Sequence, residues 1–68
     1  MATNTSQPSV GDVVLRARVR AGLTQAQLAV LSGIKYRTSI NHIERGRWNP
    51  SVALLARLLD ACQRASHG

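Results

Sequence analysis

Hydrophobic residues in this chain recur every three or four positions, with polar residues between them. This is the period of an amphipathic helix, and no segment shows the strict alternation that is typical of a β-strand. Gly and Pro residues interrupt the pattern and divide it into separate stretches. The sequence therefore predicts an all-α fold, a compact bundle of four or five short helices.

The first helix is predicted to begin after Ser9 and to end at Gly22. Ser9 is a suitable N-cap because Asp12 follows three positions later, and a glycine readily ends a helix. The apolar face of this helix comprises Val10, Val13, Val14, Ala17 and Ala21. Residues 1–8 are polar and aperiodic, so we expect them to form a disordered arm.

The second helix is predicted to begin near Gln25. Thr24 followed by Gln27 matches a capping box, in which the Thr hydroxyl accepts from the Gln27 backbone N–H and the Gln side chain reaches back. Gly33 can adopt a positive φ at little cost, so we expect it to end the helix and turn the chain.

The third helix is predicted to carry Ile40 and Ile43 on its inner face and to end at Gly46. Its remaining positions are hydrogen-bonding residues, namely Arg37, Thr38, Ser39, Asn41 and His42. Two short helices joined by a tight turn, the second with a polar outer face, are typical of a helix-turn-helix that reads the DNA major groove.

The last helix is predicted to follow Asn49-Pro50 or Ser51, with the proline in its first turn. Its apolar face comprises Val52, Leu55, Leu58, Leu59 and Cys62. We interpret Cys62 as a core residue rather than a reactive thiol. The folded domain is expected to span 9–65, the chain to fray from Arg64 onward, and 66–68 to form a frayed C-terminus.

Composition narrows the functional classes. The 68 residues suffice for one domain, and the formal net charge of +6 favours a phosphate-rich partner over a merely soluble basic surface. The few carboxylates and His residues show no spacing suited to catalysis or to a metal, so we expect neither an enzyme nor a cofactor. The polar N-terminus indicates no membrane anchor, and we expect a cytoplasmic, nucleoid-associated protein.

Several short motifs, by their order and spacing, resemble the lambda-repressor-like Cro/C1-type helix-turn-helix family. They are Arg18, Gly22–Gln25, Leu28-Ala29, Gly33-Ile34, Ile40, Ile43–Gly46 and Asn49–Ser51. The chain departs from the family between Gly33 and Ile40, where it has one residue more than usual. Lys35 or Tyr36 consequently stands where the family has a Ser or Thr cap, and the start of the third helix is the boundary this insertion affects.

The resemblance also implies a structural ion pair between Arg18 and Glu44. A guanidinium offers a carboxylate two parallel hydrogen bonds, which would fix the third helix against the first. The alternative is that Glu44 is a free surface charge.

The candidate DNA contacts fall into two groups. The base-reading candidates are Arg37, Thr38, Ser39, Asn41 and His42. The phosphate-binding candidates are Gln25, at a helix N-terminus, and Lys35, Tyr36, Arg45, Arg47 and Trp48. Alternative roles remain for four of these residues. Ser39 could pack near the turn, Asn41 could face solvent, His42 could act as a ligand or pH switch, and Trp48 could cover the core. Arg57 and Arg64 are interpreted as solvated charges.

Val30, Leu31 and Leu54 occupy positions that are usually polar in the family, so they form either an exposed patch for a protein partner or an extension of the core. The sequence thus favours a double-stranded DNA-binding transcriptional regulator, most simply a repressor, that pairs weakly or only on DNA. The alternatives are an antitoxin-type or accessory factor with a protein partner, a pure protein-interaction module, and an RNA-binding protein, which the scarcity of aromatic residues disfavours.

Overall fold

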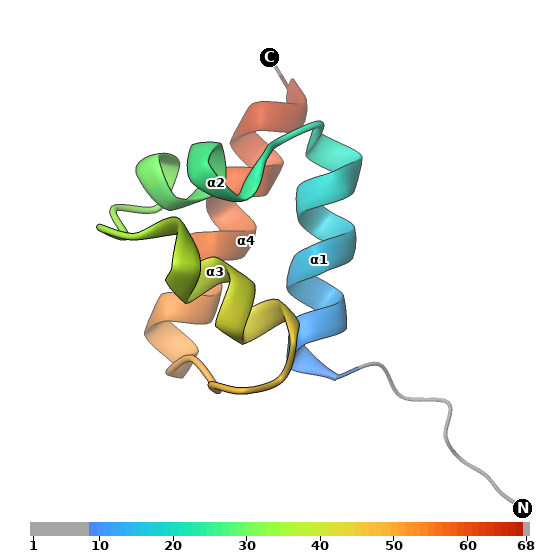
Figure 1. Ribbon diagram of the computed structural model, residues 1–68. Helices are drawn as coiled ribbons and strands as arrows, with labels where there is room; N and C mark the ends of the chain where they lie inside the picture. The colour runs from blue at the N-terminus through green and yellow to red at the C-terminus, as the bar shows by residue number, and fades with distance from the viewer. Residues whose placement is uncertain (1–8, 68) are drawn as a thin grey trace, which may run out of the picture.

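A computed structural model describes residues 9–67, which fold into four helices (Figure 1). The predicted all-α fold is therefore confirmed. Helix α1 spans Val10–Ala21, α2 spans Gln25–Leu31, α3 spans Arg37–Glu44 and α4 spans Val52–His67. The arm expected at 1–8, like Gly68, lies outside the described residues.

Side-chain caps set the starts of α1 and α2. The Ser9 hydroxyl accepts from the Asp12 N–H at 3.1 Å, and Gly22 ends α1 with a φ of 73°. In α2 both bonds of the capping box are present. The Gln27 N–H donates to the Thr24 hydroxyl at 3.0 Å, and the Thr24 N–H donates to the Gln27 side-chain oxygen at 2.8 Å. Helices α1 and α2 therefore begin after Ser9 and Thr24, whose hydroxyl groups pair an N–H group of the first turn that has no partner within the helix.

The turn between α2 and α3 accommodates the extra residue. Ser32 follows the last residue of α2, and Gly33 reverses the chain with a φ of 77°. Ile34 then packs partly against the core, whereas Lys35 and Tyr36 are exposed. Helix α3 starts after Tyr36, whose side chain makes no capping bond. The insertion is thus taken up in a projecting loop.

Of the two caps predicted for α4, Ser51 is confirmed, whereas the placement of Pro50 in the first turn was wrong. The Ser51 hydroxyl caps the helix, accepting from the Leu54 N–H at 3.1 Å, so Pro50 precedes the cap instead of occupying the first turn. The helix continues through His67, although fraying was expected from Arg64. Ser66 supports this last turn by donating to the carbonyl oxygen of Cys62 at 3.1 Å.

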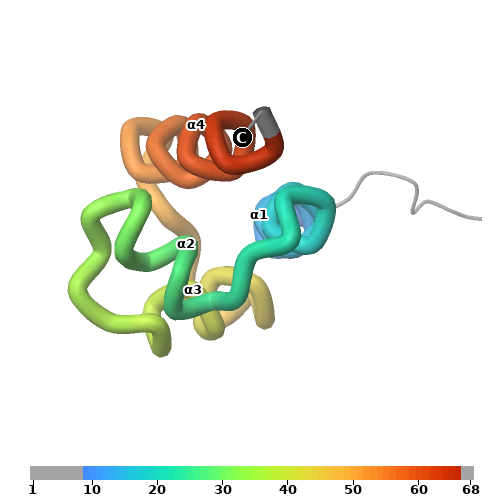
Figure 2. The backbone as a smooth tube through the Cα atoms, turned by 90° about the horizontal axis from the view of Figure 1, so that it is seen from above, coloured from blue at the N-terminus to red at the C-terminus, as the bar shows by residue number. Residues whose placement is uncertain are grey.

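The core lies where all four helices meet. Its fully buried side chains come from every helix and are Val14, Leu28, Ile40, Ile43 and Leu58. Cys62 is buried beside them, as expected, whereas Val52 is 86% exposed and does not belong to the apolar face of α4. Seen from above, α4 lies along one side of α2, and α3 lies on the other side of α2 (Figure 2). Helix α1 stands to the right of α2 in this view.

A close helix contact at Gly11 escaped the sequence analysis. A Cβ atom at this position would lie 2.5 Å from the Ile43 carbonyl oxygen and 2.7 Å from that of Glu44. The missing side chain therefore lets the first turn of α1 approach the last turn of α3.

Candidate nucleic-acid interface

Helix α3 presents its polar face to solvent because its inner face is anchored in the core. Ile40 and Ile43 are almost completely buried, whereas Arg37, Thr38 and His42 are exposed. Ser39 and Asn41 are half-buried at the sides of the helix. All five predicted base-reading residues thus belong to α3, and three of them are fully available to a ligand.

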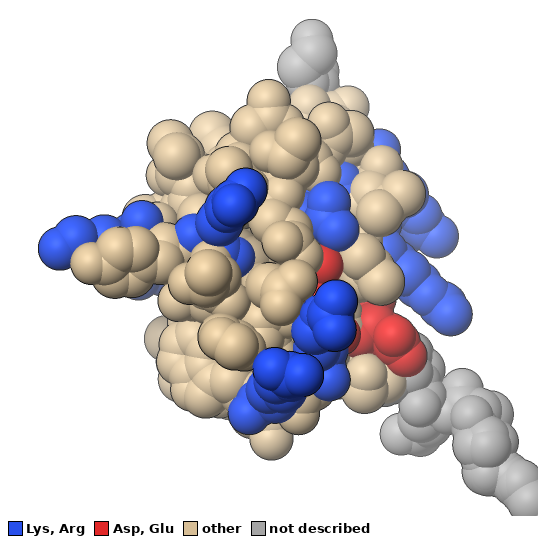
Figure 3. All heavy atoms as spheres, viewed as in Figure 1, with Lys and Arg blue, Asp and Glu red and all other residues tan. Residues whose placement is uncertain are grey.

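Basic side chains flank α3 at both ends. In Figure 3 they gather over the α2–α3 connection at the left and around the end of α3 and the α3–α4 connection at the bottom. Lys35 belongs to the first connection, and its ammonium lies 5.6 Å from the centre of the Tyr36 ring. The second carries Arg45, Arg47 and Trp48, all exposed. The arrangement suits a duplex groove edged by two phosphate backbones.

The loop after α3 is held in place by its backbone. The Arg47 N–H donates to the His42 carbonyl oxygen at 2.9 Å, and Gly46 has a φ of 76°. Trp48 is 46% exposed, so it neither covers the core completely nor stands free of it. This loop presents Arg47 beside α3.

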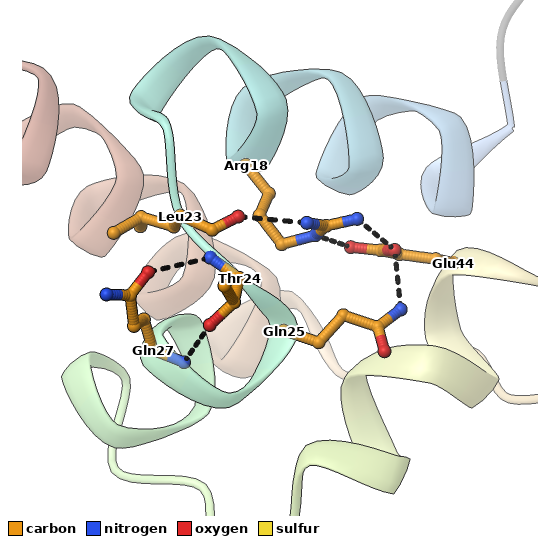
Figure 4. Close-up of polar contacts among 6 residues, drawn as sticks. All are labelled: Arg18, Leu23, Thr24, Gln25, Gln27 and Glu44. Carbon is orange, nitrogen blue, oxygen red and sulfur yellow. Dashed lines mark hydrogen bonds and ion pairs between the residues drawn. The ribbon is translucent and has the colours of Figure 1, made fainter.

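Arg18 and Glu44 form a nearly buried ion pair (Figure 4). Arg18 donates from Nε to Oε2 at 2.7 Å and from Nη2 to Oε1 at 3.1 Å, and its Nη1 donates to the Leu23 carbonyl oxygen at 2.9 Å. The two side chains are only 15% and 5% exposed. The hydrogen bonds that Arg18 donates to Glu44 raise the pKa of Arg18, and its desolvation by burial opposes this shift. The structure therefore excludes the alternative in which Glu44 is a free surface charge.

Gln25 joins the same cluster. Its Nε2 donates to Glu44 Oε1 at 3.0 Å, across from the guanidinium of Arg18 (Figure 4). The side chain predicted to bind phosphate is therefore directed to a carboxylate. Sequence reasoning missed this bond because its partner lies in another helix.

Arg57 has a structural contact, contrary to its interpretation as a solvated charge. Its Nη2 donates to the Ser32 carbonyl oxygen at 2.8 Å, and the same nitrogen lies 2.6 Å from where a Cβ of Gly33 would stand. This bond ties α4 to the end of α2. Arg64, in contrast, pairs with Asp60 of the same helix, with 3.0 Å between Arg64 Nε and Asp60 Oδ2. The Arg64 side chain is 81% exposed, so it is the surface charge expected.

The predicted apolar patch exists only in part. Val30 and Leu31 are 78% and 56% exposed, whereas Leu54 packs against the core. The two exposed residues border a shallow groove that is lined also by Leu23, Ala26 and Gln27. Leu54 is therefore removed from the patch, which lies on the outer side of α2.

Other kinds of site find little support in the described structure. Within residues 9–67, no three His, Cys, Asp or Glu side chains cluster in a way that could hold a metal ion. None of the described helices combines the length and apolarity needed to cross a bilayer. Burial raises the pKa of the Cys62 thiol, and this side chain is packed in the core at 3% exposure.

The geometry defines a helix-turn-helix protein, in which α2 and α3 meet at a glycine turn and α3 is presented outward. A family model described as a helix-turn-helix domain matches residues 9–67, and the chain belongs to that family. Helix-turn-helix domains typically bind double-stranded DNA. Comparison with curated proteins gave no match, and comparison with solved structures gave none either.

Proposed function

We propose that the protein is a Cro/C1-type transcriptional regulator, most simply a repressor, that binds a specific duplex DNA site through the major groove. The observation that carries the proposal is the exposed polar face of α3 between two basic connections. Such a protein would work in the cytoplasm, at the nucleoid, and needs no cofactor for this activity.

The proposed roles follow from side-chain chemistry. Arg37 forks onto a guanine edge and Asn41 pairs with an adenine, while Thr38 and Ser39 contact a thymine methyl or a phosphate. His42, exposed on the same helix, is available to a base edge or a phosphate. These residues would supply the sequence preference.

Residues beside α3 would supply affinity without sequence preference. Lys35 and Tyr36 would contact one phosphate backbone, and Arg45, Arg47 and Trp48 the other. Neutralisation of about four to six phosphates would make log K fall with log salt by about 0.9 per contact.

Substitution of one residue from each group tests the proposal. Arg37→Ala should cost about 1–3 kcal/mol on the preferred site and relax preference at one base position. Arg47→Ala should weaken binding to all duplexes and reduce the salt slope by about one contact. Selection from random duplexes supplies the preferred site, and titrations at several salt concentrations measure both effects. Equal losses by both variants on preferred and random duplexes would refute the division of roles.

The groove beside Val30 and Leu31 favours a second candidate function, that of an accessory or antitoxin-type factor. Such a protein would bind DNA through α3 and a protein through the outer side of α2. Exposed apolar surface commonly marks a protein contact. Loss of a co-purifying partner on Leu31→Glu, with DNA binding retained, would support this second candidate.

A further inference from the structure

Glu44 is the point where three helices are joined by directional bonds. It is the last residue of α3, and it accepts from Arg18 of α1 and from Gln25, the first residue of α2 (Figure 4). Both carboxylate oxygens are used, since Oε2 receives Nε of Arg18 and Oε1 receives Nη2 of Arg18 together with Nε2 of Gln25.

The bond from Gln25 competes with phosphate binding by the same side chain. One of its two amide hydrogens is directed to an ionised carboxylate, and such charge-assisted bonds are stronger than neutral ones. A phosphate that took this hydrogen would have to approach Glu44 and displace the amide from it. The side chain is half-buried, so it is also less available to a ligand than the basic residues beside α3.

The other end of α3 lacks an equivalent bond. Tyr36 stands at the N-cap without a side-chain hydrogen bond, and the preceding loop contains the extra residue. Ile40 and Ile43 hold the middle of the helix by hydrophobic contact, which has no directional preference. Within residues 9–67, the side-chain hydrogen bonds that tie α3 to α1 and α2 are thus those at Glu44.

We propose that Gln25 is a positioning residue that sets the orientation of α3 through Glu44, instead of a phosphate ligand. The inference rests on the proposed function, because the orientation of α3 matters only if this helix reads DNA. Arg18 holds Glu44 against α1, and Gln25 holds it against α2. Together they fix the angle between the two helices of the helix-turn-helix.

The two roles predict different losses on Gln25→Met, which keeps the length of the side chain and removes its donors. A positioning residue affects the site-specific complex, in which base edges must meet α3 in register. We therefore expect affinity for the selected duplex to fall by about tenfold and affinity for random duplexes to change by less than about twofold. Gln63→Met is the matched control, because Gln63 is exposed on α4. Equal losses on both duplexes would overturn the proposal in favour of a phosphate contact.

Thermal unfolding without DNA tests the contact itself. The variants are Gln25→Met, the pair Arg18→Met with Glu44→Leu, which removes the acceptor without leaving a charge unpaired, and all three substitutions combined. We expect Gln25→Met to lower the Tm of the wild-type protein and to have a much smaller effect once Glu44 is replaced. Additive Tm shifts would show that the two residues do not interact, and would overturn the inference. A third outcome is possible, in which the Tm shifts of the variants are coupled but the wild-type protein shows no preference among duplexes. This outcome would refute the proposed function, and with it the role of Gln25 in positioning α3 for reading DNA.

Discussion

Glu44 shows how a single carboxylate can serve a basic, DNA-directed protein without repelling its ligand. Its side chain is 5% exposed and its charge is compensated by Arg18 at 2.7 Å. A charge so enclosed depends on its partner, since an uncompensated buried charge is strongly unfavourable.

Glu44→Ala is therefore expected to destabilise the domain by about 3–5 kcal/mol, because Arg18 would stay desolvated without its partner. A domain of this length has only about 3–10 kcal/mol in total, so much of the population should unfold. The double variant Arg18→Met with Glu44→Leu should recover a good part of the loss, since it leaves no charge unpaired. Urea unfolding followed by circular dichroism measures all three proteins. An unchanged midpoint for Glu44→Ala would contradict the structural role of the pair.

The sequence could indicate some of these contacts and not others. Thr24 and Gln27 lie within one turn, so their reciprocal bonds follow from local spacing. Arg18 and Glu44 are far apart along the chain, and only resemblance to a family indicated their pairing. The bonds from Gln25 to Glu44 and from Arg57 to the Ser32 carbonyl oxygen had no local signal, because each joins different helices.

At the scale of the helices, boundaries followed from caps wherever a polar side chain and a glycine flanked the helix. Ser9, Thr24 and Ser51 each accept the expected backbone bond. Helix α3 was harder to delimit because Tyr36 supplies no such bond. Helix α4 is assigned through His67, because an apolar pattern that fades does not by itself break a helix.

The contact of Gly11 with α3 predicts that a glycine-to-alanine replacement, which usually stabilises a helix, will here lower the stability of the protein. Replacement of a glycine by alanine inside a helix ordinarily stabilises it by about 1 kcal/mol. Gly11→Ala should instead lower the Tm, because the new methyl group would meet two backbone carbonyl oxygens of α3, at 2.5 and 2.7 Å. Arg16→Ala, at an exposed position of the same helix, is the control for propensity alone. A higher Tm for Gly11→Ala would mean that α1 and α3 lie further apart than described.

At the scale of the whole molecule, charged and apolar surfaces lie on neighbouring elements. Basic residues flank α3 at both ends, while the apolar groove lies on α2, where Leu31 also borders hollows lined by Arg57, Asp60 and Arg64. If α3 reads bases as we propose, one such helix would span only a few base pairs, and specificity would call for two protomers on half-sites about 34 Å apart. The formal net charge of +6 opposes their association in free solution.

We accordingly expect a monomer at micromolar concentration that pairs weakly or only on DNA. If the groove supplies the contact, Leu31→Glu should remove about tenfold cooperativity between two half-sites while leaving binding to one half-site unchanged. Val19→Glu is the matched control, since Val19 is exposed on α1 and does not line the groove. Sedimentation and titration of one-site and two-site duplexes provide the measurements. A tight dimer in free solution that persists in Leu31→Glu would exclude this surface as the contact.

Helix α3 holds itself in place with one set of residues and exposes another set, and this separation has an evolutionary consequence. The residues that hold the helix are Ile40, Ile43 and Glu44, and the exposed side chains of Arg37, Thr38 and His42 make no hydrogen bond to the rest of the described chain. After a gene duplication, these outward positions can diverge freely while the inward ones stay fixed. One ancestral framework can in this way give rise to lineages that bind different DNA sequences, each only a few substitutions from the next.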